Sequence, residues 1–172
     1  MRRADHQPAE VYLQPGEVYL AREPTLIRTI LGSCVGVAFW STRFRAGALC
    51  HALLPRCPRE TVDPVQGHRY VDFSILELAR EFDQIGVSRR EVQVKLFGGA
   101  DVLPVGDSNP LRPTVGRMNC EVAIEVLRDE GFEVAASSLG GTTGRSILFH
   151  TGTGEVQLRW LARTVPEDVI EG

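Results

Sequence analysis

A cysteine, a histidine and a glycine-serine step are spaced in this sequence so that they could support nucleophilic catalysis. Cys34 follows Gly32 and Ser33 in the stretch TILGSCVGVAFW, and His51 lies in the next apolar run. A cysteine hydrolase needs a thiol nucleophile, a base within hydrogen-bonding reach and backbone N–H groups that stabilise an oxyanion. Glycine allows backbone conformations that expose such N–H groups beside a reacting atom. A paired imidazole can also lower a thiol pKa from about 8.5 to below neutral.

The same residues equally fit a structural role. Cys34 opens a long apolar run, and buried cysteine is a common core residue. Spacing alone therefore leaves Cys34 open between core packing and catalysis, and His51 by itself is no more decisive.

Zinc binding is the rival chemistry for this part of the chain. Cys50, His51, Cys57 and His68 lie within one short stretch, and thiolates and imidazoles both bind zinc. Paired zinc ligands are usually separated by about two to four residues, whereas the adjacent Cys50 and His51 would point to opposite faces of a strand. We therefore expect no metal here.

The glycine-rich stretch LGGTTGRS (139–146) has some features of a phosphate-binding loop. Such a loop requires four residues between its glycines and then a lysine, but Gly140 and Gly144 flank three residues and Arg145 follows. The stretch instead predicts a hairpin turn. Arg145 is then a surface or strand-edge residue, or an anchor for a carboxylate or a loop.

Length and composition indicate a single globular domain over residues 1–172. The chain has 43% hydrophobic and 24% charged residues and a net charge of −3, which gives no reason to expect a nucleic-acid surface. No apolar stretch approaches the roughly 20 residues that span a bilayer, and the polar start lacks the apolar core of a signal peptide. We expect a cytoplasmic protein without membrane insertion, whose four cysteines are free thiols.

The elements that must position these residues are mostly strands. Apolar and β-branched runs predict them at 10–13, 17–20, 25–31, 34–40, 48–55, 91–99, 132–141, 145–151 and 155–161. The pair 34–40 and 48–55 reads as a hairpin that carries Cys34 and His51.

Two stretches have helical periodicity. One covers 71–86, with Asp72 as its cap and Gly86 as its stop; the other covers about 119–130, with Asn119 as its cap and Gly131 as its stop.

Loops are predicted at 56–69 and 101–115, and loosely held tails at about 1–9 and 165–172. Gly98 and Gly99 read as a bulge or a strand end. We predict an α+β fold with two helices packed on a largely antiparallel sheet or sandwich.

Six stretches, in the same order along nearly the whole chain, resemble signatures of the CheD family of chemoreceptor glutamine deamidases. They are TILGSCVGV, GALCHALLP, RYVDFSILEL, KLFGGADVL, VGRMN and LGGTTGRSILFHTGTGEV. Each stretch alone is weak, but their shared order makes the resemblance specific.

The resemblance implies that Cys34 is the nucleophile and His51 the general base and acid, with no cofactor. A threonine just upstream would orient the histidine; Thr29 is our choice, and Thr25 is the alternative. Backbone groups at Gly32 and Ser33 would support the oxyanion. The remaining residues on the family signatures are read as structural supports of the site: Gly98, Gly99, Asn119 and Arg145.

The resemblance also implies a fold similar to that of toxin deamidases of the cytotoxic necrotizing factor type. The expected substrates are glutamine side chains of methyl-accepting chemotaxis receptors, and glutamate methyl esters should also be accepted. A CheC-type phosphatase is an expected partner. In the alternative reading, the protein mainly regulates such a phosphatase and has little or no catalytic activity.

Overall fold

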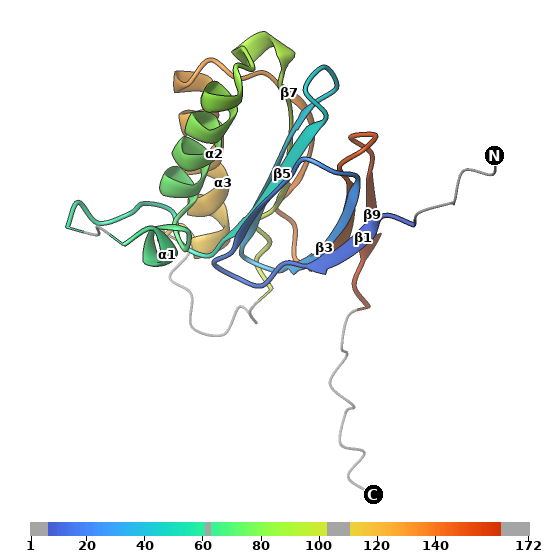
Figure 1. The fold of residues 1–172 in the computed structure, drawn as a ribbon. Helices are drawn as coiled ribbons and strands as arrows, with labels where there is room; N and C mark the ends of the chain where they lie inside the picture. Colours follow the sequence, from blue (N-terminus) through green and yellow to red (C-terminus); the bar gives the residue numbers. More distant parts are fainter. Residues whose placement is uncertain (1–6, 61–62, 103–110, 163–172) are drawn as a thin grey trace, which may run out of the picture.

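The chain folds into three layers, in which two helices, a five-stranded sheet and a four-stranded sheet lie one upon another (Figure 1). The structure, a computed structural model, describes residues 7–60, 63–102 and 111–162. The expected tail at 165–172, most of the tail at 1–9 and parts of both predicted loops lie outside the described residues.

The strands and helices follow one another closely along the chain. The strands are β1 (Ala9–Tyr12), β2 (Val18–Ala21), β3 (Thr25–Leu31), β4 (Val35–Ser41), β5 (Ala46–Ala52), β6 (Gln93–Gly98), β7 (Val134–Leu139), β8 (Arg145–His150) and β9 (Val156–Trp160). The helices are α1 (Pro64–Gly67), α2 (Val71–Ile85), the 3-10 turn η1 (Arg89–Glu91) and α3 (Val115–Asp129).

Both sheets are mainly antiparallel. One has the strand order β1-β3-β8-β9 and the other β2-β5-β4-β6-β7. The parallel pairs are β1 with β3 and β6 with β7, each at a sheet edge. The prediction of an α+β domain with a sandwich of sheets and two main helices is confirmed.

Apolar side chains fill both spaces between the layers. Alternate residues of the five-stranded sheet pack against α2 and α3, among them Val37, Phe39 and Cys50. The residues between them in sequence face the four-stranded sheet, among them Ala38 and Leu49. This alternation is the period of two that a strand imposes on its side chains.

The alternation along β5 separates Cys50 from His51. Cys50 is fully buried in the helix-facing core, where loss of solvent raises its pKa to about 12. Its neighbour His51 must therefore face the four-stranded sheet. All four cysteines are free, as the sequence predicts.

The N-caps of the two main helices differ from those predicted. Tyr70 is the N-cap of α2, while the Asp72 carboxylate accepts hydrogen bonds from the N–H groups of Cys57 and Phe73. The predicted stop is confirmed, because Gly86 ends α2 with φ of 90°.

Helix α3 starts at Val115, so Asn119 is not its cap. Thr114 is the N-cap, and its hydroxyl accepts a hydrogen bond from the N–H of Arg117 at 3.2 Å. Because Gly116 is a poor helix former, the sequence did not predict this first turn. Position 116 requires glycine because a Cβ there would lie 2.7 Å from the carbonyl oxygens of Gly99 and Ala100.

Candidate active site

Thr29 and His51 meet in the space between the two sheets. Thr29 on β3 and His51 on β5 are both buried, and Thr29 Oγ1 lies 2.7 Å from His51 Nδ1. The Thr29 hydroxyl donates its single hydrogen to the carbonyl oxygen of Leu13, at 2.7 Å. It must therefore accept a hydrogen bond from His51, which puts the proton on Nδ1 and a lone pair on Nε2.

His51 Nε2 is buried and has no hydrogen-bond partner among the described residues. A buried nitrogen lone pair without a partner is costly in a purely structural histidine. The nitrogen is thus available to take a proton from a group that enters the site.

Thr25, the alternative threonine, lies elsewhere. Its hydroxyl donates to the carbonyl of Glu23 at 2.9 Å, and its N–H donates to the hydroxyl of Thr151. Thr25 and Thr29 are four residues apart on one strand, so both face inward, but at different levels. Of the two threonines, Thr29 is the one that forms a hydrogen bond with His51 in the described part of the chain.

Cys34 stands one residue before β4, on the same face of the sheet as His51. The predicted hairpin is confirmed, with Gly36 opposite His51 in the β4/β5 pairing. Cys34 is two residues from Gly36 and is therefore a diagonal cross-strand neighbour of His51. Its half-buried side chain packs against the residues between the sheets.

The backbone before β4 is held from one side. Three successive carbonyls accept hydrogen bonds: Gly32 O from the N–H of Ala100 at 2.9 Å, Ser33 O from Asn119 Nδ2 at 2.9 Å, and Cys34 O from the N–H of Gly99 at 2.8 Å. In a trans peptide the N–H points opposite to the carbonyl. The N–H groups of Ser33 and Cys34 therefore point away from these partners. This direction leaves them available to a substrate oxygen.

Gly98 and Gly99 make this close approach possible. Their φ angles are 105° and 66°, which side chains rarely allow. A Cβ on Gly98 would overlap the Cys34 carbonyl oxygen, and one on Gly99 would overlap the sulfur of Cys120. The two glycines form a strand end, one of the two predicted possibilities, that lies against the backbone of residues 32–34.

Arg145 is fully buried, so the prediction of a surface or strand-edge residue is wrong and the loop-anchor reading is correct. Its guanidinium donates to the carbonyls of Ser138 and Gly140 and stacks 4.6 Å from the ring of Trp160. The N–H of Gly140 in turn donates to Gly98 O at 2.9 Å. Arg145 thus fixes the loop that supports the Gly98 backbone.

Burial keeps both His51 and Cys34 uncharged at neutral pH. Desolvation lowers the pKa of His51 to about 4, although the Leu13 carbonyl and the charge of Glu17 oppose it. Desolvation also raises the pKa of the Cys34 thiol, against a smaller lowering by its own backbone N–H. At neutral pH the thiol and the imidazole are therefore both uncharged, so neither the thiolate nor the charged imidazole of a preformed ion pair is present.

The proposed zinc ligands do not converge. No group of three or more histidine, cysteine, aspartate or glutamate side chains in the described parts of the chain could hold a metal ion. His68 packs its ring against Phe73, with centroids 5.8 Å apart.

Within residues 7–60, 63–102 and 111–162, no helix has the length and apolar character needed to cross a lipid bilayer.

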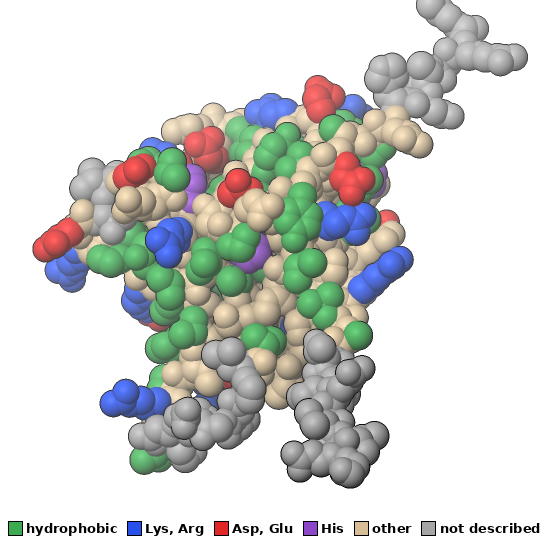
Figure 2. Space-filling model, turned by 90° about the horizontal axis from the view of Figure 1, so that it is seen from below, with side chains coloured by type: hydrophobic (Ala, Val, Ile, Leu, Met, Phe, Trp, Pro, Cys, Tyr) green, Lys and Arg blue, Asp and Glu red, His purple; other side chains and the backbone are tan. Residues whose placement is uncertain are grey.

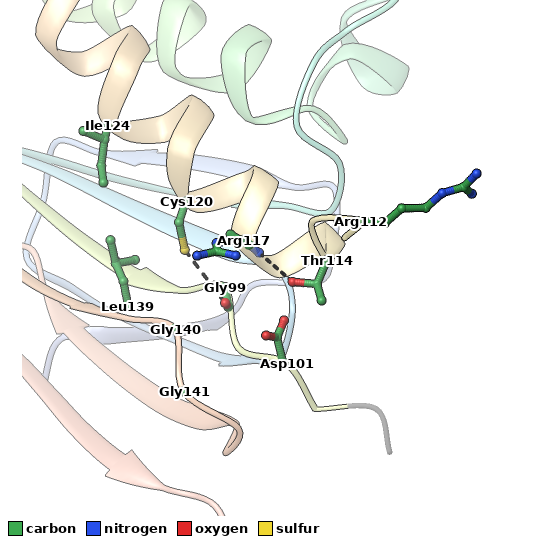
Figure 3. Close-up of a pocket in the computed structure, with 10 residues that line it drawn as sticks. All are labelled: Gly99, Asp101, Arg112, Thr114, Arg117, Cys120, Ile124, Leu139, Gly140 and Gly141. Atoms are coloured by element: carbon green, nitrogen blue, oxygen red, sulfur yellow. Dashed lines mark hydrogen bonds between the residues drawn. The ribbon is translucent and has the colours of Figure 1, made fainter. Parts of the chain in front are cut away.

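A pocket of about 570 Å³ is lined by Gly99 and by residues of α3 and the loop after β7 (Figure 3). Arg117 and Thr114 from the start of α3 line it together with Leu139 and the half-buried Cys120. Neither Cys34 nor His51 lines it. The end of the molecule that carries α1 presents mostly hydrophobic and uncharged side chains across its middle (Figure 2).

Sequence reasoning missed the Leu13 carbonyl, and it named Asn119 as a support of the site without its bridging contacts. The Leu13 carbonyl is a backbone oxygen, and the Asn119 amide donates to two backbone oxygens. Backbone atoms have no signature in a sequence. The motif VGRMN did mark Asn119, but its position inside α3 could not be read from spacing.

Comparison with known proteins adds a family match. Residues 53–160 match the family described as CheD chemotactic sensory transduction. The matched stretch begins after Cys34 and His51.

Similar sequences cover more of the chain. A probable chemoreceptor glutamine deamidase CheD 2 of Geobacter sulfurreducens is 49% identical over 154 residues, which cover 90% of this chain and 91% of that protein. A probable chemoreceptor glutamine deamidase CheD of Maridesulfovibrio salexigens is 36% identical over 157 residues, covering 89% and 92% of the two chains.

Among solved structures, Neisseria meningitidis protein NMB0706, of the family DUF152, aligns with a TM-score of 0.46 and 14% identity. The alignment covers 79% of this chain and 64% of that chain.

Proposed function

The chain belongs to the CheD family, and from that premise we propose that it deamidates glutamine side chains of chemoreceptors, with Cys34 as nucleophile and His51 as general base and acid. The observation that carries the proposal is the buried hydrogen bond between Thr29 and His51. This hydrogen bond leaves His51 Nε2 unprotonated. Nε2 has no partner among the described residues, and His51 lies on the same face of the sheet as Cys34.

The first step of the proposed reaction is attack by Cys34 on the carboxamide carbon of glutamine. His51 Nε2 takes the thiol proton as the carbon–sulfur bond forms, because the thiol is uncharged at rest. The N–H groups of Ser33 and Cys34 donate to the oxyanion of the tetrahedral intermediate. Thr29 stabilises the imidazolium by accepting its Nδ1 hydrogen.

The second step releases ammonia and then glutamate. His51 returns its proton to the departing nitrogen, the carbon–nitrogen bond breaks and a thioester remains on Cys34. Water then loses a proton to His51 and attacks the thioester, the carbon–sulfur bond breaks, and His51 returns the proton to the Cys34 sulfur. The thiol is restored and the glutamine has become a glutamate, so each turnover adds one negative charge to the receptor.

Glutamate methyl esters are proposed as second substrates. They present a similar acyl carbon and replace the amine with methanol as the leaving group, so the same residues serve the same steps. No metal or cofactor takes part in either reaction as proposed.

The proposed substrate is a protein surface in the cytoplasm. It is supported by the mostly hydrophobic and uncharged face in Figure 2, on which a receptor segment could lie. We further propose a CheC-type phosphatase as partner, and a fold related to toxin deamidases of the cytotoxic necrotizing factor type. The second proposal is supported by the cysteine and histidine on one face of neighbouring strands.

The proposal is tested by incubating cytoplasmic fragments of chemoreceptors with the wild type and with Cys34→Ala. Mass spectrometry follows the increase in peptide mass that accompanies replacement of NH₂ by OH in the glutamine side chain. We expect conversion by the wild type and none by Cys34→Ala. Cys57→Ala is the matched control, because Cys57 is also a half-buried free thiol but lies in the loop after β5.

Equal conversion by the wild type and Cys34→Ala would refute the nucleophile assignment. If neither protein converts receptor glutamines, but both change the activity of a CheC-type phosphatase, the regulatory alternative replaces the deamidase.

A further inference from the structure

Asn119, which belongs to α3, joins the segment before β4, where the candidate nucleophile lies, to the segment that follows β5, the strand of the candidate base. Its Nδ2 donates to Ser33 O at 2.9 Å and to Leu53 O at 3.0 Å. The side chain is fully buried. The β4/β5 pairing ends with Val35 opposite Ala52. Leu53 directly follows Ala52, and Ser33 lies two residues before Val35.

The two segments separate at this point. Beyond β5, the N–H groups of Leu53 and Leu54 donate to the carbonyl of Arg69, so this segment turns toward the start of α2. Before β4, Gly32 O accepts from the N–H of Ala100, so that segment follows the end of β6. The Asn119 amide fills the gap between them and replaces the next rung of the sheet.

The orientation of the Asn119 amide is fixed by its acceptors. Two carbonyl oxygens require two N–H donors, and the opposite orientation would set oxygen against oxygen. The amide oxygen Oδ1 is left buried and without a partner among the described residues. An unsatisfied buried oxygen costs free energy. The amide keeps its two hydrogen bonds to Ser33 and Leu53 despite that cost.

We propose that Asn119 is a positioning residue that holds the Ser33–Cys34 peptide so that its N–H faces the oxyanion, in register with the strand that carries His51. Ser33 O and the Cys34 N–H belong to one planar peptide, so fixing the carbonyl fixes the direction of the N–H. Leu53 directly follows β5 and is two residues from His51, so one amide holds the backbone on both sides of the site. This inference rests on the proposed deamidase function.

The test compares Asn119→Ala and Asn119→Asp with the wild type on receptor fragments. Alanine removes the bridge, and aspartate keeps the shape but sets a carboxylate against two carbonyls. We expect kcat to fall by about 10²–10³-fold for alanine, the range for loss of one oxyanion donor, and further for aspartate. KM should change by less than about threefold, because the substrate-binding face is untouched.

A second readout does not depend on deamidation. The rate at which iodoacetamide alkylates Cys34 is followed against pH by peptide mapping. The Cys34 N–H helps to stabilise its own thiolate. We expect the alkylation profile of both Asn119 variants to move to higher pH, because the peptide is no longer held.

Ser74→Ala is the matched control. Ser74 is also buried in a helix and donates to a backbone carbonyl, that of His68 at 3.0 Å, but it does not contact Ser33 or Leu53. We expect it to lower the melting temperature and leave kcat and the alkylation profile as in the wild type.

The inference is overturned if the Asn119 variants keep the wild-type alkylation profile and lose no more kcat than Ser74→Ala. It is also overturned if Asn119→Ala, Asn119→Asp and Asn119→Ser all fail to fold, since Asn119 would then be required for the fold itself. Failure of the wild type to deamidate receptors refutes the proposed function, while the alkylation profiles still test the role of Asn119.

Discussion

At the scale of single residues, the site depends on the direction of one hydrogen bond. Thr29 has one hydroxyl hydrogen, and Leu13 O accepts it, so His51 must donate from Nδ1 and keep a lone pair on Nε2. A hydroxyl here plays the orienting part that a carboxylate plays in other triads. Because the hydroxyl carries no charge, it does not offset the desolvation that lowers the pKa of His51.

Replacing Thr29 tests this hydrogen bond. We expect Thr29→Val to lower kcat by about 10–100-fold, because His51 loses the acceptor that fixes its tautomer. Thr29→Ser should restore most of the activity. Thr25→Val is the matched control and should affect stability alone. Equal losses of kcat for Thr25→Val and Thr29→Val would contradict the assignment of Thr29.

The pH dependence of kcat/KM reports the pKa of His51. The imidazole must be neutral to act as base, so activity is expected to fall only as pH drops toward about 4. The measurement is kcat/KM between about pH 4 and 8 on a receptor fragment. Glu17→Gln removes a charge that raises the pKa of His51, and should move the fall to lower pH. A fall centred near 6.5, the ordinary histidine value, would contradict the buried neutral imidazole.

At the scale of elements, residues 32–34, which include the proposed nucleophile, are held by the end of β6 together with the first turns of α3. The turn at Gly98 and Gly99 supplies one N–H, and Asn119 supplies the side-chain amide. Arg145 holds the loop after β7 against the same turn. The position of Cys34 therefore depends on segments far away in the sequence.

Two glycine substitutions separate strain from site disruption. Gly86→Ala meets no atom within 4 Å, so we expect only the strain of a positive φ, about 1 kcal/mol, and unchanged activity. Gly98→Ala has the same kind of strain and also a clash with Cys34 O. We expect it to destabilise by more than about 2 kcal/mol and to abolish activity. Thermal unfolding and deamidation measure both, and an active Gly98→Ala enzyme would refute the close approach.

At the scale of the whole molecule, the site lies where two sheets and a helical layer meet at one end of the domain. Thr29 comes from the four-stranded sheet and His51 from the five-stranded sheet; Cys34 directly precedes a strand of the five-stranded sheet, and Asn119 comes from α3. All three layers must pack before the site exists. His51, the proposed base, is then buried in the interior, and its charge state becomes coupled to folding.

This coupling predicts how stability depends on pH. The pKa of His51 is about 4 in the folded state and about 6.5 when unfolded, so between these values the unfolded chain binds more protons. Stability is fully present above about 6.5 and is lost as pH falls toward 4, by about 3 kcal/mol for this group.

Denaturant unfolding of the wild type and His51→Gln between about pH 4 and 7 isolates this contribution from that of the carboxylates. We expect the variant to lose less stability on acidification. Parallel curves for the two proteins would show that His51 is not buried neutral.

The sequence by itself determined the strands, the helical periodicities and the family, because these depend on local spacing and on ordered motifs. It marked Cys34 and His51, but spacing left them open between core and catalysis, and it left Thr25 and Thr29 unresolved. Only the tertiary structure decided that Thr29 meets His51, that Asn119 bridges two strands and that Arg145 is buried. These contacts join residues from different layers, several through backbone oxygens, and no local pattern encodes which distant segments will pack together.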